Sequence, residues 1–456
     1  MPLFHPDSRG CKFSAVIAFF ICTNAYSQTD AAIALERQSD AAFQQVLQQP
    51  QNLGLWSTYA NLLIKQGNYE GGVAALERLL LEPDARPELR VDVGVLYYRM
   101  ASYAQADVLL RTALEDDRLQ GDKRALATAL VADIAKRLQT SQLTGAVTFG
   151  LRRQSNALFR TDSAQVIVAG VAVPYTLKPE ANTDASLGLR VRHLYDLEAQ
   201  NSAAIVTNFG AYIVNYSASA GSQIQANPTK PYDLLALDLS TGLQFKPLPG
   251  DSPGVTLRPH VLWSNVLAQG QQYISNQGLG LDASWQASER TLFDFTLDGQ
   301  RRTFTNRLDV PNPDQLNARL TNLRARVAHE LAAGHVVSGD YVMRRTRAGR
   351  DFYSSDSQEL RVTYAMSYVS PMKDGSNWIT SIYAGALRRT YIAPDPAVSA
   401  TQKREDNESR FGINHLVPIT PVWSLLFGFE QARNQANFAN FNYKNTLLSG
   451  TVIRSF

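Results

Sequence analysis

Apolar and polar side chains alternate along the last two thirds of the chain. In one clear segment Leu279 and Leu281 share one face, while Asp282 and Ser284 share the other. Successive side chains of a β-strand point to opposite faces, so a period of two predicts an amphipathic strand. The pattern recurs in fourteen short segments between Leu143 and Phe456. We therefore expect fourteen antiparallel strands.

Alternation is also typical of soluble sandwiches and propellers, which hide one face of each strand. The links between segments favour another class, because links after odd-numbered segments are long and links after even-numbered segments are generally short. Outer-membrane barrels have this asymmetry, and an even strand number returns the chain to its starting side. We therefore predict a closed transmembrane β-barrel. The predicted long links are Ser155–Asn182, Ser217–Lys230, Ala268–Gln277, Thr303–Asp314, Thr346–Glu359 and Ala393–Ser409.

One segment, Ala164–Tyr175, does not follow this scheme. It is strongly apolar on both faces and contains Pro174, so it suits neither a lipid-facing strand nor a polar loop. It is either a hairpin, which would make sixteen strands, or a piece folded into the pore as a plug. We place it within the first long link.

Before the barrel segments, from Asp30 to about Gln142, the apolar period is that of helices. Two similar units lie 34 residues apart, and the first runs from Trp56 to Pro83. This is the tetratricopeptide period, in which small residues let two antiparallel helices approach each other. We predict a short α-helical tetratricopeptide solenoid, and its concave groove either binds a partner, is an ordinary solvated surface or docks onto the barrel's own turns. The predicted groove residues are Asn61, Lys65, Tyr98 and Arg99, with Ser57 and Val95.

The first residues have the layout of a secretory signal. Arg9 and Lys12 precede the apolar run Phe13–Cys22, and small residues before Gln28 predict cleavage there. Both cysteines fall in this removed segment, so the exported chain would hold no disulfide. No later stretch has the eighteen or more uninterrupted apolar residues of a transmembrane helix.

These features predict an α+β multidomain chain with a signal peptide at 1–27, a periplasmic tetratricopeptide-repeat domain at 28–142 and an outer-membrane β-barrel at 143–456. Outer-membrane lipids are the expected surroundings of the barrel. A formal charge of +3 is too small to indicate nucleic acid as a partner. The final Phe456 is typical of barrels that are inserted by the bacterial barrel assembly machinery.

Charged residues of both signs recur on the strand register opposite the lipid face. They either line a wet passage or satisfy one another in a narrow barrel. The expected lumen-lining residues are Arg190, Arg192, Arg258, Asp282, Asp294, Asp298, Arg324 and Arg326, with Asp238, Arg361, Arg388 and Glu430 on the same register. An aromatic girdle at the membrane surface is expected from residues near strand ends. These are Trp263, Trp285, Trp378 and Trp423.

Catalytic and cofactor chemistry finds little support. His329-Glu330 and His335 resemble a zinc helix, but the histidines are six residues apart and such ligands need four-residue helical spacing. No glycine-rich phosphate loop, nucleophile elbow or paired-cysteine site is present in the sequence. We predict no catalytic residue, no metal site and no cofactor, and hence a protein that is not an enzyme.

In plan, the chain resembles the surface lipoprotein assembly modifier family. The resemblance rests on the Trp56–Pro83 repeat, on Gly145-Ala146-Val147-Thr148-Phe149-Gly150-Leu151-Arg152 with Ser155-Asn156-Ala157 after it, and on Phe456. The family implies an outer-membrane translocon that moves lipoproteins, and sometimes soluble clients, to the cell surface. The resemblance further implies that the barrel is the passage and that the repeats engage the client.

Three other functions remain open. Exopolysaccharide exporters also place periplasmic tetratricopeptide repeats before a barrel, but generally carry many more repeats. A general solute porin is a second alternative, but it assigns no function to the helical repeats. A soluble binding protein is a third, but it does not explain the barrel pattern. An exporter of polysaccharide should have a lumen rich in aromatics or in one sign of charge.

Overall fold

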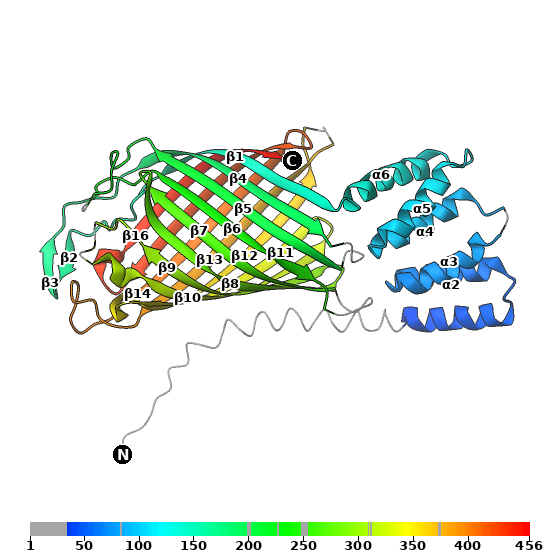
Figure 1. Ribbon diagram of the computed structural model, residues 1–456, viewed down its shortest axis with the longest axis horizontal. Helices are drawn as coiled ribbons and strands as arrows, with labels where there is room; N and C mark the ends of the chain where they lie inside the picture. Colours follow the sequence, from blue (N-terminus) through cyan, green and yellow to red (C-terminus); the bar gives the residue numbers. More distant parts are fainter. Residues whose placement is uncertain are drawn as a thin grey trace, which may run out of the picture. The chain divides into compact units, whose positions relative to one another are not determined.

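The computed structural model divides the chain into two units, with the boundary between Gln139 and Thr140 (Figure 1). The predicted signal segment and both cysteines lie outside the described residues. The structure describes residues 34–456, except 83, 198–201, 226–227, 248–253, 309, 311 and 373–374.

The first unit is α-helical. A helix over 34–48 precedes five more, and both α2 to α4 and α3 to α5 are offset by 34 residues. Asn52 and Asn68 cap α2 and α3, because each side chain accepts a backbone N–H of the first turn. No helix among the described residues is long and apolar enough to cross a membrane. The helices are α2 (Leu53–Lys65), α3 (Tyr69–Leu80), α4 (Pro87–Arg99), α5 (Tyr103–Leu114) and α6 (Gly121–Arg137).

Small residues let paired helices pack closely. A Cβ at Gly72 would lie 2.8 Å from Ile64 of the preceding helix, and one at Gly94 would lie 2.8 Å from Leu110 of the following helix. Apolar side chains of consecutive helices fill the space between them, as in the cluster around fully buried Val91. The spacing and the close approach agree with the expected repeat, while its assignment as tetratricopeptide stays a prediction.

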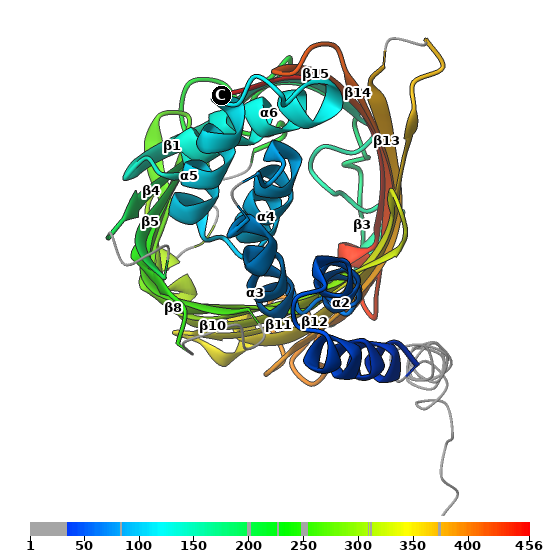
Figure 2. The same ribbon diagram turned by 90° about the vertical axis from the view of Figure 1, so that its right-hand side faces the viewer.

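The second unit is a closed barrel of fourteen antiparallel strands, which confirms the predicted barrel and its strand number. Figure 2 shows the wall as a continuous ring. The strands are β1 (Ser141–Gln154), β4 (Asn182–Asp196), β5 (Ala203–Tyr216), β6 (Leu234–Phe245), β7 (Val255–Ala268), β8 (Gln271–Ser288), β9 (Thr291–Phe304), β10 (Ala318–Ala332), β11 (His335–Ala348), β12 (Ser355–Val369), β13 (Asn377–Tyr391), β14 (Glu405–Pro418), β15 (Trp423–Ala436) and β16 (Tyr443–Ser455).

The ring closes where the last strand meets the first. Residues 146–154 of β1 pair with 447–455 of β16, and Gly145 and Phe456 exchange backbone hydrogen bonds at the end of this register. Closure leaves no open sheet edge along the wall, which lipid requires because it offers no hydrogen bonds to a free backbone.

The links at one end of the barrel, the loop end, include long ones such as 155–181 and 217–233. Several at the other end, the turn end, are tight, as between Ala332 and His335. The predicted long link Ala268–Gln277 is wrong. Gln269 and Gly270 alone make this turn, and both have the positive φ that a type I′ hairpin turn requires. The polar residues after them continue β8.

The outward faces of the strands are apolar. Leu151 is 53% exposed, Leu279 is 68% exposed and Phe427 is 51% exposed, although all three lie in paired strands. Such a belt on a closed barrel is stable only in a lipid environment. Trp285, Trp378 and Trp423 lie near the turn end of their strands, as a girdle requires, whereas Trp263 lies further along β7.

The apolar segment Ala164–Tyr175 is a hairpin of β2 (Gln165–Val168) and β3 (Val171–Pro174). It pairs only with itself and is not part of the barrel wall, so the count is fourteen and not sixteen. Figure 1 shows it at the loop end.

Candidate functional site

The strand register determines which residues face the lumen, because directly opposed residues of neighbouring strands share a face. Asp282 pairs with Arg258 on one side and Thr296 on the other, and this series continues round the ring on the face opposite the apolar belt. Arg388 differs from the prediction, since it pairs with Gln358 on the outward face. The structure places on the inward register all of Arg190, Arg192, Arg258, Asp282, Asp294, Asp298, Arg324 and Arg326.

Many lumenal charges are satisfied by neighbours on the wall. Arg258 donates to Asp282 at 2.7 and 3.0 Å, and Asp282 also accepts from Thr296 at 2.8 Å. Asp298 accepts from Asn322, and Arg324 bonds Asp340. These pairs lie between adjacent strands, so they stiffen the wall without crossing the passage.

Other lumenal charges are free. Arg190, Arg192, Arg326 and Asp238 are exposed, and among the described residues none of the four side chains has a hydrogen-bond or ion-pair partner. Water must solvate such groups, because an unpaired charge is very costly in a dry interior. The middle of the barrel is therefore wet, and its charges have both signs.

At the loop end, the lumen wall is tightly packed along β16, β1 and β4. Inward-facing Gln154, Asn182, Asp184 and Asn445 are each at most 6% exposed. Asp184 accepts from Arg152 Nε at 2.7 Å and from Gln154 Nε2 at 2.9 Å. The first long link, residues 155–181, begins and ends beside these residues, and we call it the cap segment.

Asn156 anchors the cap segment to the wall. This side chain is 1% exposed, and its amide donates to the carbonyl oxygens of Arg160 at 2.7 Å and of Lys444 at 3.1 Å. Its side-chain oxygen accepts the backbone N–H of Arg160 at 2.9 Å, and its own backbone N–H donates to Asn445 Oδ1 at 3.0 Å. One asparagine thus ties the cap segment to the start of β16.

Arg160 holds the other side of the cap. Its guanidinium, with a side chain only 8% exposed, donates to the carbonyl oxygen of Thr229 at 2.8 Å in the link between β5 and β6. It also lies 3.7 Å from Glu180, which forms an ion pair with Lys230. The hairpin extends these contacts, since Ala169 and Gly170 donate to Ala397 and Val398. The cap segment therefore joins the links after β5 and β13 at the loop end of the barrel.

Acid should loosen the cap segment. A hydrogen bond from Lys230, together with the charge of Arg160, lowers the pKa of the Glu180 carboxyl below its usual 4.5. A lowered pKa means that the contribution of Glu180 is present above pH 4.5 and is lost as pH falls through the lower folded-state pKa. We expect the single-channel conductance in planar bilayers to rise only as the pH falls below 4.5. In Glu180→Gln this acid step should disappear, and an unchanged acid step in that variant would rule out Glu180 as its source.

The helical unit contains a separate groove of about 920 Å³. Of the predicted groove residues, Asn61 and Arg99 line it, with Ser57 and Val95, whereas Lys65 and Tyr98 do not. Tyr98 instead donates to Asp133 at 2.6 Å and packs against Tyr103. Leucines form much of the groove wall. Acidic residues at its rim are Glu82, Asp84, Glu88 and Asp92.

The histidines are scattered. His329 bonds Thr291 on the outward face, and His335 bonds Tyr364, so the two do not share a ligand position. No group of three His, Cys, Asp or Glu residues suited to a metal ion occurs within the described ranges.

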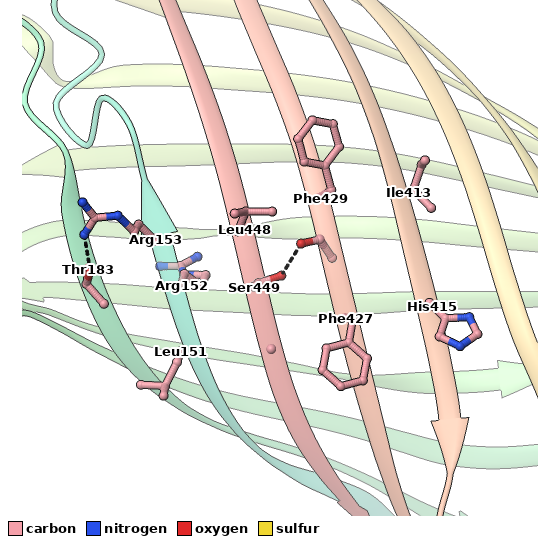
Figure 3. Close-up of a pocket in the computed structure, with 12 residues that line it drawn as sticks. Leu151, Arg152, Arg153, Thr183, Ile413, His415, Phe427, Phe429, Leu448 and Ser449 are labelled. Carbon is pink, nitrogen blue, oxygen red and sulfur yellow. Dashed lines mark hydrogen bonds between the residues drawn. The ribbon is translucent and has the colours of Figure 1, made fainter.

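An apolar groove of about 620 Å³ crosses the outside of the wall over β14, β15, β16 and β1 (Figure 3). Leu151, Phe427, Phe429 and Leu448 line it, and Arg153 bonds Thr183 at one edge. All four apolar side chains belong to the outward register. The groove is therefore part of the lipid-facing belt and not of the passage.

No protein-family model matches the chain, and no curated protein matches it. Among solved structures, the COG4313 outer membrane channel from Pseudomonas putida F1 is 15% identical, with a TM-score of 0.34, covering 69% of this chain and 96% of that one. The anion-selective porin from Comamonas acidovorans is 7% identical, with a TM-score of 0.36 and coverages of 69% and 99%. A Pseudomonas aeruginosa FadL homologue is 9% identical, with a TM-score of 0.36 and coverages of 71% and 91%. Similarity this low carries no inference about function.

The residues that hold the cap were not found as a site from the sequence. Asn156 and Arg160 follow a strand and look like ordinary loop residues, and Asp184 reads as one polar position in an alternating strand. Their partners Asn445 and Thr229 lie far along the chain. The one available signal was chemical, since an Asn directly after a strand often bonds nearby backbone.

Proposed function

We propose that this protein is an outer-membrane channel that delivers lipoproteins or other protein clients to the cell surface. In this proposal the turn end and the helical unit face the periplasm, the helical groove engages the client, and the barrel forms the passage. The cap segment then closes the outer end until a client is present.

One observation carries the proposal. The lumen is wet and lined by charges of both signs, and at its loop end buried side chains hold the cap segment, which is a cover in this proposal, to the wall and to another link. Free diffusion of small solutes needs no such cover. A channel for large clients does need one, because an uncovered wide pore would leak.

Mixed charge also bears on the client class. Arg190, Arg192 and Arg326 are free cations, but Asp238 is a free anion and the remaining lumenal charges are mostly paired. Polypeptides carry both signs and can pass such a wall without strong retention. A polysaccharide exporter, which should have one sign of charge or many aromatics, fits this lumen less well.

A solute porin is the second candidate, favoured by the three free arginines, which would attract small anions. The two functions differ in the resting state. A porin should conduct continuously in a planar bilayer, whereas a capped translocon should stay largely closed until the cap is released.

The helical groove gives the direct test of client engagement. We expect Asn61→Ala with Arg99→Ala to reduce the surface exposure of lipoproteins by roughly tenfold, since two polar contacts of about 0.5–1.5 kcal/mol each would be lost. Protease shaving of intact cells followed by quantitative proteomics measures this exposure. Lys65→Ala, which lies outside the groove, is the matched control.

Localisation is tested on the same cells. The wild type and both variants should fractionate with the outer membrane and migrate differently in detergent gels when heated. Undiminished lipoprotein exposure in the double variant would show that the helical groove does not engage the client. Recovery of the wild type as a soluble periplasmic monomer would contradict the proposal as a whole.

A further inference from the structure

Arginines stand directly opposite one another on the outside of three neighbouring strands near the loop end. Arg301 of β9 is the cross-strand partner of Arg319 of β10, and Arg319 is in turn the partner of Arg347 of β11. Arg345 lies on the same outward face of β11, two residues from Arg347. We call these four residues the arginine ladder, and all four are exposed.

Such an arrangement is unfavourable by itself. Directly opposed residues have Cβ atoms about 4.5–5.5 Å apart, and like charges at this spacing repel. Only Arg347 has a carboxylate, Asp356, to which it donates at 2.7 and 3.1 Å. Within the described part of the chain, Arg301, Arg319 and Arg345 have no hydrogen-bond or ion-pair partner through their side chains. The ladder therefore has an excess of positive charge that a counter-ion would neutralise.

The surroundings of the ladder indicate which counter-ion fits. Two and four residues along β9 from Arg301, on the same face, are Gly299 and Leu297. Leu297 is 50% exposed, and nothing lies within 4 Å of the place where a Cβ at Gly299 would be. An open, apolar stretch of the wall thus adjoins the ladder on the membrane side. A ligand with a negatively charged headgroup and acyl chains fits this surface, because the headgroup would bind the arginines and an acyl chain would pack on the apolar residues.

We propose that the arginine ladder binds the phosphate groups of an anionic, phosphorylated membrane lipid at the loop end of the barrel, with an acyl chain against Leu297 and Gly299. Guanidinium groups suit this role, because their planar fork donates two parallel hydrogen bonds to a phosphate. A headgroup with more than one phosphate should bind better than one with a single phosphate, because the arginines lie on three adjacent strands about 4.8 Å apart. Free phosphate would gain the charge contacts but not the apolar ones.

Native mass spectrometry of the purified full-length protein in detergent tests the proposal. The probes are lipid A with two phosphates, phosphatidylcholine as a zwitterionic lipid, and inorganic pyrophosphate. We expect lipid A to bind in preference to the other two. Arg301→Gln, Arg319→Gln and Arg345→Gln combined should weaken lipid A binding about 100-fold, because each basic residue near a charged lipid surface contributes about fivefold.

The matched control is the triple variant Arg190→Gln, Arg192→Gln and Arg326→Gln, which removes the same charge from the lumen. It should bind lipid A like the wild type. Undiminished lipid A binding in the ladder variant, equal binding of phosphatidylcholine, or binding of pyrophosphate without lipid A would each overturn the proposal.

Two further measurements do not depend on the triple ladder variant. Lipid A binding to the wild type should weaken at least tenfold between 0.1 and 1 M salt, because salt screens exposed charges. In lipid-free detergent, Arg319→Gln should raise the melting temperature, since it removes the central charge of a repelling row. No salt effect, or a lower melting temperature in that variant, would count against the ladder as an anion site.

Discussion

Alanine at both Asn156 and Arg160 should open the loop end of the barrel and raise its resting conductance. The Asn156 side chain donates to the carbonyl oxygen of Lys444 in β16, and the Arg160 side chain donates to that of Thr229 in the link between β5 and β6. Each such hydrogen bond contributes about 0.5–1.5 kcal/mol. Loss of these two hydrogen bonds shifts the balance between closed and open cap by about 1–3 kcal/mol, or roughly 5-fold to 150-fold. Single-channel recording in planar bilayers measures the open fraction.

The control for this double variant lies in the same segment. Lys178→Ala removes a positive charge as Arg160→Ala does, but only the backbone carbonyl oxygen of Lys178 takes part in the cap contacts. Its open fraction should match that of the wild type. If the Asn156 and Arg160 double variant also stays closed while the barrel remains folded, another part of the structure holds the channel shut.

Loss of the Asp184 carboxylate should have the largest effect on stability. Asp184 is 1% exposed and accepts from Arg152 and Gln154. Its removal leaves the Arg152 guanidinium partly buried without its carboxylate, and breaking a buried pair costs about 3–5 kcal/mol. Arg152 keeps some solvent access, so we expect Asp184→Ala to cost about 3 kcal/mol. The temperature at which the barrel unfolds in detergent gels should fall by several degrees.

Asp238→Ala is the matched control for Asp184→Ala. Asp238 also faces the lumen, but it is exposed and has no partner among the described residues, so its loss should leave the unfolding temperature unchanged. Equal unfolding temperatures for the two variants would contradict the assigned role of Asp184. The same measurement on Asp184→Asn separates charge from hydrogen bonding, because the amide keeps an acceptor without the charge.

Periodicity predicted the wall of the barrel well because each strand meets lipid on one side and water on the other. This constraint acts on every residue, so Leu279 and Asp282 reveal their faces without knowledge of any partner. It also placed the lumenal Arg190 and Arg258 on the inward register. It failed at Ala268–Gln277, where polar residues resembled a loop but continue β8. Hydrophobicity alone does not distinguish a polar strand end from a turn.

In the helical unit, too, the sequence predicted some features well and others poorly. The 34-residue offset predicted the helix pairs, and Gly72 and Gly94 lie where close approach requires small residues. Groove membership was predicted less well, because a one-residue difference rotates a side chain by about 100° on a helix. Asn61 and Arg99 line the groove, whereas neighbouring Tyr98 packs inside the unit.

The sequence by itself determined the barrel fold, the number of strands and, except at Arg388, the face on which each predicted lumenal charge lies, because these follow from local alternation between lipid and water. Only the tertiary structure decided that the 155–181 segment is fixed at the loop end, since its anchors join Asn156 to Asn445 and Arg160 to Thr229. Only the register of three strands decided that Arg301, Arg319 and Arg347 stand in one row. Contacts between distant residues depend on chain closure and strand register, which no single segment encodes.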